Sequence, residues 1–180
     1  MRKKQKGFSL IELLIVVAII LIIAAIAIPN LLRSRMAANE ASAVGSVRTI
    51  NTAAISYNST YGNGFPDNLL EIGGAAGAAA TCDHAGLIDS VLGGVTGTNV
   101  KSGYSFTMQP GTVAVTNKPT SCAAAGWSDG YGVTAVPTNV GNSGQRSFCS
   151  DASGVIRYDP AGGNGMFTAP ACVTTFAPLQ

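Results

Sequence analysis

The apolar positions of this 180-residue chain change their spacing at Pro29. Between residues 8 and 28 the chain has no Gly or Pro, and this apolar run of about 21 residues is long enough to span a bilayer as a helix. From residue 30 onward, apolar residues recur three and four positions apart, which predicts a helix with one apolar face. The stripe consists of Val44, Val47, Ile50, Ala54 and Tyr57. We therefore expect one helix from Phe8 to Tyr57, about 75 Å long.

Pro29 lies inside this predicted helix. A proline removes one backbone donor, and its ring crowds the carbonyl group four residues earlier, here that of Ala25. We therefore expect a kink or a weakened turn at Pro29. Gly62, Gly64 and Pro66 follow the amphipathic part and should end the helix.

The rest of the chain predicts a small head built from short elements. The apolar spacing of residues 84–92 predicts a short helix, capped by Asp83. Alternating apolar runs separated by turn residues predict five strands, and their succession indicates an antiparallel sheet. The runs cover residues 103–109, 112–116, 131–137, 146–150 and 155–159. The fold class is therefore α+β, with residues 151–154 as the hairpin turn between the last two strands.

Aromatic residues gather where the long helix should end. Tyr57, Tyr61 and Phe65 are expected to seal the contact between helix and sheet. Trp127, the only tryptophan, is expected to anchor a loop on the sheet.

Basic residues are concentrated before the apolar run. The chain has 11 Lys and Arg against 9 Asp and Glu, but four of the basic residues precede the run. By the loop-charge rule, this leader keeps the N-terminus in the cytoplasm and sends the rest across the membrane. The leader residues are Arg2, Lys3, Lys4 and Lys6. The few basic residues of the head are scattered, so nucleic acid is not predicted as a partner.

Four cysteines lie beyond the apolar run, and none of them belongs to a CxxC pair. Scattered cysteines in an exported body favour disulfides over zinc, with four reduced thiols as the alternative. Three pairings are possible, and the ease of closing local loops favours Cys82 with Cys122 and Cys149 with Cys172. The Gly- and Pro-rich tail from Pro160 is expected to be loose unless Cys172 holds it.

One ionisable residue, Glu12, interrupts the apolar run four residues after Phe8. A charged carboxylate near the bilayer centre costs about 2.5–3.5 kcal/mol on insertion scales, and less toward an end. The positive end of the helix dipole lies close by and favours the charged form. Glu12 therefore requires a partner.

These residues resemble a known signal. The basic leader, Gly7, and the sequence Phe8-Ser9-Leu10-Ile11-Glu12 before a long apolar stretch resemble the class III signal of type IV pilins and type II secretion pseudopilins, the N-methylphenylalanine prepilins. The resemblance covers residues 6–29 and extends through the long helix. It implies a pilin-like fold, in which the long helix packs on a small antiparallel sheet. The implied regions are a cleaved leader (1–7), a transmembrane and assembly helix (8–29), an amphipathic continuation (30–58) and an α+β head with disulfides (59–180).

The resemblance also implies a function. In that family a prepilin peptidase cuts after the glycine that matches Gly7 and methylates the new amine on the residue that matches Phe8. The glutamate that matches Glu12 is needed for subunits to assemble into a helical homopolymer, driven by an assembly ATPase and an inner-membrane platform protein. The chain would then be a structural subunit of a type IV pilus-like filament and no enzyme; the alternative is a pseudopilin of a type II secretion system. It would begin as a single-pass protein among inner-membrane lipids, with a cytoplasmic N-terminus, and end in a periplasmic or cell-surface filament.

Cleavage of the leader has a physical consequence. It frees an α-amino group on Phe8, and the ordinary pKa of such a group, near 7.7–8.0, leaves it mostly charged at neutral pH. Because Glu12 lies one helical turn away, the amine of an incoming subunit can neutralise the Glu12 of a subunit already in place. An unpaired carboxylate in an apolar bundle is the costly alternative, and this cost selects the register of assembly.

Three other interpretations compete with this one. Ala25-Ile26-Ala27 fits the cleavage pattern of a secretory signal, but the apolar run is too long and holds Glu12. A plain membrane anchor explains the length of the run and leaves the Gly7–Phe8 junction as a coincidence. A binding module for DNA or a surface, displayed at a fibre tip, predicts a basic or aromatic patch on the head. A hydrolase has no support, because no paired acids lie beside the lone histidine.

No cofactor or metal is expected. His84 is the only histidine, which excludes a cluster of histidines as metal ligands. Asp151, Asp159 and Asn164 could supply oxygen atoms to calcium, but they do not match the D-x-[DN]-x-[DN]-G loop.

Overall fold

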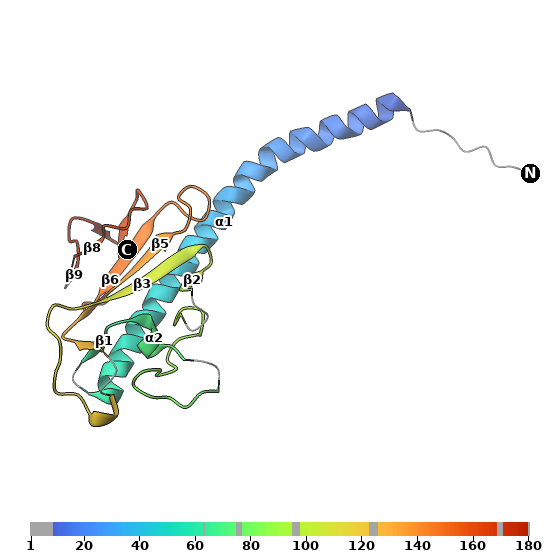
Figure 1. Cartoon of the computed structure of the whole chain (residues 1–180). Coiled ribbons are helices and arrows are strands. Elements are labelled where there is room, and N and C mark those ends of the chain that lie inside the picture. Colours follow the sequence, from blue (N-terminus) through green and yellow to red (C-terminus); the bar gives the residue numbers. More distant parts are fainter. Residues whose placement is uncertain are drawn as a thin grey trace, which may run out of the picture. The chain divides into compact units, whose positions relative to one another are not determined.

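The computed structural model describes residues 9–62, 64–74, 77–94, 98–122, 126–168 and 171–179 (Figure 1). The chain divides into two compact units, Met1–Arg35 and Met36–Gln180. The first unit holds the apolar run, and the second holds the amphipathic part of the long helix together with the sheet. Phe8 lies outside the described residues.

One long helix opens the described chain, as predicted. Helix α1 (Leu10–Tyr61) has 52 residues, about 78 Å at the rise of an α-helix. It runs through Pro29 without a break, and the kink at Pro29 stays a prediction. The helix ends four residues after the predicted Tyr57, at Gly62, which has a φ of +98° and donates its N–H to the Asn58 carbonyl at 3.1 Å. Glycine adopts this left-handed conformation without steric cost, which suits it to end a helix.

The second half of α1 buries the predicted stripe. Val44, Val47, Ile50, Ala54 and Tyr57 are all buried in the core of the second unit. Figure 1 shows the strands of the main sheet lying along this part of the helix. The period of three and four residues therefore identified the packing face correctly.

The main sheet is antiparallel throughout and has six strands in the order β10-β7-β6-β5-β3-β2. Four of its strands match predicted runs closely. They are β3 (Tyr104–Pro110), β5 (Tyr131–Pro137), β6 (Ser147–Asp151) and β7 (Arg157–Asp159). The edge strands β2 (Val100–Lys101) and β10 (Ala177–Pro178) were not predicted. The predicted turn at 151–154 is present: Gly154, with a φ of +74°, donates its N–H to the Asp151 carbonyl at 2.9 Å.

The predicted strand at 112–116 is wrong. Within this run only Ala114 forms a bridge, to Ser128 of β4 (Trp127–Ser128). Ser128 is already paired on its other side with Phe65 of β1 (Phe65–Pro66). Val115 of this run packs against the core, but Val113, which alternates with it, is 59% exposed. An alternating pattern that buries so little surface is too weak to form a strand.

The predicted helix at 84–92 is also wrong. This segment forms turns, because the N–H groups of Ala85, Gly86 and Leu87 each donate to a carbonyl group of residues 71–73 at a distance of 2.8 Å. Those bonds fix a non-helical path. Asp83 caps no helix there, and Asp89 instead accepts the N–H groups of Val91 and Leu92.

Two of the three carbonyl groups that hold this segment, those of Glu71 and Ile72, belong to a short helix that was not predicted. Helix α2 (Leu69–Ile72) has only four residues, too few for a periodic signal. Asn68 caps it, since its side-chain oxygen accepts the N–H groups of Leu70 and Glu71.

Both disulfides predicted from loop closure are present. Cys82 pairs with Cys122 and Cys149 pairs with Cys172, with Cα–Cα distances of 5.4 and 6.0 Å. The alternative of four reduced thiols is therefore contradicted.

The aromatic residues at the end of α1 pack as predicted. The rings of Tyr57 and Tyr61 are 4.9 Å apart, and those of Phe65 and Tyr131 are 5.1 Å apart. Trp127 is buried, and its indole N–H donates to the Tyr57 hydroxyl at 2.8 Å. The hydroxyl in turn donates to the Cys82 carbonyl at 2.6 Å. The polar atoms of this aromatic cluster are thus paired although they are buried.

The C-terminal segment is held on the sheet and is not loose. A ribbon of β8 (Phe167–Thr168) and β9 (Ala171–Cys172) contacts β5 and β6, and Cys172 is bonded to Cys149 of β6. The Phe167 ring occupies the space where a Cβ at Gly132 would lie. The second unit therefore has helix α1, the sheet and this ribbon packed in succession.

Candidate functional site

The apolar run forms a helix with no buried face. Within the first unit, its large apolar side chains are 44–80% exposed from Leu10 to Leu32. A helix that is apolar all round needs lipid or other helices to cover it. By length and composition α1 is able to cross a membrane, a property that a signal sequence near the N-terminus shares. This apolar surface could therefore insert into a membrane or pack against other helices.

Glu12 is the single acidic residue of the exposed run. Its Oε2 accepts the backbone N–H of Ser9 at 2.9 Å. Its Oε1 has no hydrogen-bond partner among the described residues. The carboxylate therefore keeps one oxygen available for a donor from outside the described chain.

Ser9 is a residue of this site that the sequence analysis did not single out. Ser9 precedes the first helical residue, and Glu12 reaches back to its N–H, which is half of a capping box. The pattern Ser-x-x-Glu before an apolar run is the signal that would have identified it. Because this bond uses a backbone group, it survives any change of the Ser9 side chain.

The remaining predicted site residues are dispersed. Gly7 and Phe8 lie outside the described residues, and Pro29 lies within α1. The four disulfide cysteines all belong to the second unit, where they stabilise the head.

The acidic residues considered for calcium serve turns instead. The Asp151 carboxylate accepts the N–H groups of Ser153 and Cys172, and the Asp159 carboxylate those of Ala161 and Gly163. Burial alone would raise the pKa of Asp151, but these bonds and the nearby Arg157 hold its pKa below the ordinary value. Among the described residues no group of three or more His, Cys, Asp or Glu could hold a metal ion.

Comparisons with known proteins concern the N-terminal segment. Residues 2–28 match the family described as the prokaryotic N-terminal methylation motif. The chain carries the N-terminal methylation motif. The resemblance to the class III signal is thereby confirmed, and the motif residues lead directly into the exposed run of α1.

A pilus protein is similar to a short part of this chain. The chain is 63% identical over 38 residues to the type IV wide pilus major component PilA4 of Thermus thermophilus. The match covers 21% of this chain and 29% of the relative, so the chain is aligned with less than a third of that protein. No solved structure matches the chain. The likeness to this relative therefore covers about a fifth of the chain.

Proposed function

We propose that this chain is a structural subunit of a type IV pilus-like filament, polymerised through α1 from the inner membrane. The observation that carries the proposal is a methylation motif whose glutamate lies on an apolar helix that has no buried face. The aligned relative is a pilus major component, which favours a pilus over a secretion pseudopilus.

Leader removal is the switch in this mechanism. A prepilin peptidase cuts between Gly7 and Phe8 and methylates the new amine. The Ser9 N–H remains on the mature chain, so one oxygen of Glu12 keeps its cap while the other accepts the amine of a neighbouring subunit. The pair then removes an uncompensated charge from the apolar bundle.

The partners follow from this mechanism. Copies of the chain cover the apolar surface of α1, and inner-membrane lipid covers it before assembly. An assembly ATPase and a platform protein supply the force that moves each subunit from lipid into the filament. The head then lies in the periplasm or outside the cell.

The processing step is tested by replacing Gly7 with a bulky residue in the full chain. The uncut precursor should accumulate in the membrane, because the peptidase no longer accepts the junction. N-terminal mass spectrometry of membrane and filament fractions measures this. Native protein that begins at Met1 or at Ile28 would contradict the assigned cleavage.

The assembly step is tested by Glu12→Ala beside Ser9→Ala. Glu12→Ala should insert and be cut, yet yield no filaments, because the charge pair is lost. Ser9→Ala keeps the N–H that caps Glu12 and should still give filaments. Sheared filaments are counted by electron microscopy. As high a filament yield from Glu12→Ala as from Ser9→Ala would contradict the role of Glu12 in assembly, and short periplasmic fibres would indicate the pseudopilin.

A further inference from the structure

Two arginines follow the apolar run of α1 directly. Between Ser9 and Arg35 the chain has three ionisable residues: Glu12, Arg33 and Arg35. Both arginines are exposed, and both belong to the first unit, which ends at Arg35. Neither guanidinium group has a hydrogen bond or an ion pair with any described residue. Both are therefore open to a partner from outside the described chain.

The spacing of these charges matches the thickness of a bilayer. Arg33 lies 21 positions after Glu12 on the unbroken helix α1, which corresponds to about 32 Å along the helix axis. The hydrocarbon core of a bilayer is about 30 Å thick. When Arg33 lies at one surface of the bilayer, Glu12 therefore lies at the other. Neither charge then has to enter the hydrocarbon, where it would be costly.

Arg33 and Arg35 lie on opposite sides of α1. Consecutive residues of an α-helix are rotated by about 100°, so positions two apart differ by about 200°. Each arginine therefore faces different lipids. The long apolar stem of an arginine can lie along the hydrocarbon while its charged end reaches the headgroups.

The chemistry of the guanidinium group favours phosphate as its partner. Its planar fork of N–H donors matches two oxygens of one phosphate, whereas the ammonium group of a lysine acts as a point charge. Lipid phosphate is also the anion present at the depth where the apolar run ends. A lipid headgroup therefore meets both the chemical and the positional requirement.

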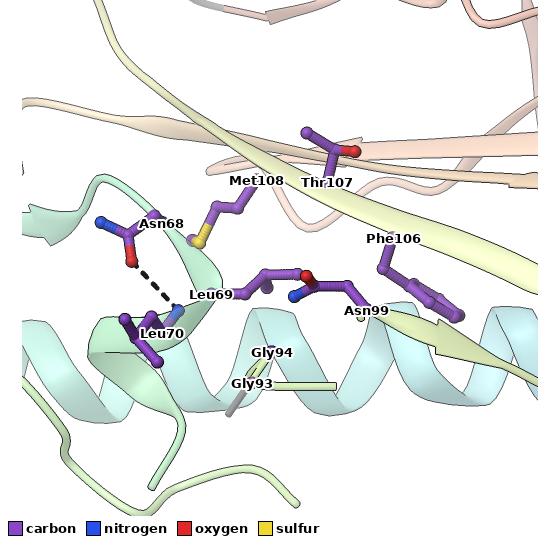
Figure 2. A pocket seen from close by; sticks show the side chains of 9 residues that line it. All are labelled: Asn68, Leu69, Leu70, Gly93, Gly94, Asn99, Phe106, Thr107 and Met108. Carbon is purple, nitrogen blue, oxygen red and sulfur yellow. Dashed lines mark hydrogen bonds between the residues drawn. The ribbon is translucent and has the colours of Figure 1, made fainter. Parts of the chain in front are cut away.

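The described cations of the head are mostly engaged within it. Arg146 is paired with Glu40 at 2.7 Å and Lys101 with Asp89 at 2.8 Å. The recess of about 280 Å³ beside β3, shown in Figure 2, has no charged side chain among the described residues that line it. Arg48 is exposed and has no ion pair within the described ranges, but it belongs to the second unit and does not follow an apolar run. Arg48 is therefore a suitable control for the two arginines of the first unit.

We propose that Arg33 and Arg35 each bind the phosphate of a lipid headgroup at the non-cytoplasmic surface of the membrane before the subunit is assembled. This inference rests on the proposed function, in which the leader stays in the cytoplasm and α1 crosses the inner membrane. The two phosphates hold the subunit at a depth where Glu12 lies at the cytoplasmic surface. Entry into a filament then requires the release of both phosphates.

The test measures the distance from arginine Cζ to lipid phosphorus in the full chain. The chain is labelled with ¹³C at the guanidinium carbons and placed in vesicles of phosphatidylethanolamine and phosphatidylglycerol. The buffer contains no phosphate, so only lipid carries phosphorus. Solid-state NMR dephasing of ¹³C by ³¹P should detect a separation of about 4 Å, as expected for a bidentate pair. Arg2 of the leader can add a signal of its own, so each variant is compared with the wild-type chain.

Glutamine variants assign the signal. Arg33→Gln and Arg35→Gln should each remove part of the dephasing, and the double variant should remove both parts. Arg48→Gln is the matched control and should leave the dephasing unchanged. The mass of each variant under non-reducing conditions shows that both disulfides have formed. Equal dephasing in the wild-type chain and the double variant overturns the binding of phosphate.

A second measurement tests the depth of the subunit. The chain has three glutamates, and Glu40 and Glu71 are buried in the head. With ¹³C-labelled glutamate, the side-chain signal that gains intensity fastest by transfer from water should therefore be that of Glu12. Glu12→Gln identifies this signal by removing it. A Glu12 signal without water contact overturns the assigned depth.

The outcomes separate the two proposals, because the vesicles contain no assembly machinery. Loss of the phosphate contact or of the assigned depth overturns this inference and leaves filament assembly intact. A wild-type chain that shows the phosphate contact, yet yields no filaments in the presence of the assembly machinery, overturns the proposed function and leaves the headgroup contact standing.

Discussion

At the scale of single residues, Glu40 joins α1 to the start of β6. It is 8% exposed and accepts the N–H groups of Gln145 and Arg146 as well as the Arg146 guanidinium, whose Nη2 lies 2.7 Å from Oε2. Burial alone would raise the pKa of Glu40, but the bonds from residues 145 and 146 outweigh it and hold the pKa below the ordinary value. Because the pKa of Glu40 is lower in the folded protein than in the unfolded chain, Glu40 stabilises the fold at pH values above its unfolded-state pKa.

The first prediction concerns Glu40→Ala. The free energy of unfolding should fall by about 2–3 kcal/mol at neutral pH, because the two N–H groups and Arg146 lose their acceptor. Urea titration of the full chain in detergent, followed by the fluorescence of Trp127, measures it. Asp89→Asn is the matched control: its ion pair with Lys101 is largely exposed and should contribute at most about 1 kcal/mol. Equal losses in the two variants would contradict the role of burial.

The second prediction concerns pH. The stability that Glu40 supplies should be present above the ordinary glutamate range and be lost as pH falls through its lowered pKa. Glu71 acts in the opposite sense, because burial raises its pKa and its stabilising protonated form is lost as pH rises through that value. The acid branch of the wild-type stability curve should therefore become shallower in Glu40→Gln. An unchanged acid branch would show that other carboxylates carry it.

At the scale of elements, the spacing of apolar residues predicted a helix or strand correctly where that element buries one face. The stripe on α1 and the alternation in β3 each follow one buried face, so the sequence was sufficient to predict them. Strand β5 is buried on both faces, and its apolar run between turn residues predicted it. Residues 84–92 have helical spacing, yet their N–H groups bond to the end of α2, a tertiary choice that spacing does not encode. Ser9, whose N–H donates to Glu12, was missed although the pattern Ser-x-x-Glu before an apolar run was sufficient to identify it.

The third prediction compares the two disulfides. They separate residues by 40 and 23 positions, and loop-closure entropy then gives about 3–4 kcal/mol for each. Replacing both cysteines of one pair by serine should lower the urea midpoint by a similar amount in either case. The proteolysis patterns should differ, since only loss of the Cys149–Cys172 pair frees the C-terminal ribbon. Identical cleavage products from both variants would contradict this assignment.

At the scale of the whole molecule, the chain combines two units with different solvent requirements. The first exposes its apolar side chains all round, while the second has its own core, which begins at Ala43 on α1. The solvent requirement of each unit was predictable from its composition, whereas the boundary at Arg35 depends on contacts between residues that are distant in the sequence.

The fourth prediction concerns a fragment of residues 36–180. It should stay soluble without detergent, form both disulfides and keep the fluorescence of a buried Trp127, because its core lies within the second unit. Size-exclusion chromatography and emission spectra check this. The full chain without detergent is the control and should aggregate through residues 10–32. Aggregation of the fragment as well would show that the head depends on the apolar helix.

The overlap of the Phe167 ring with the missing side chain of Gly132 limits how this protein can vary. Any larger residue at 132 would expel the ring and lift the ribbon that carries it. Substitutions on the outer side of the ribbon should be tolerated as long as position 132 remains glycine. Because glycine carries only a hydrogen atom in place of a side chain, position 132 leaves room for the ring that holds the ribbon on the sheet.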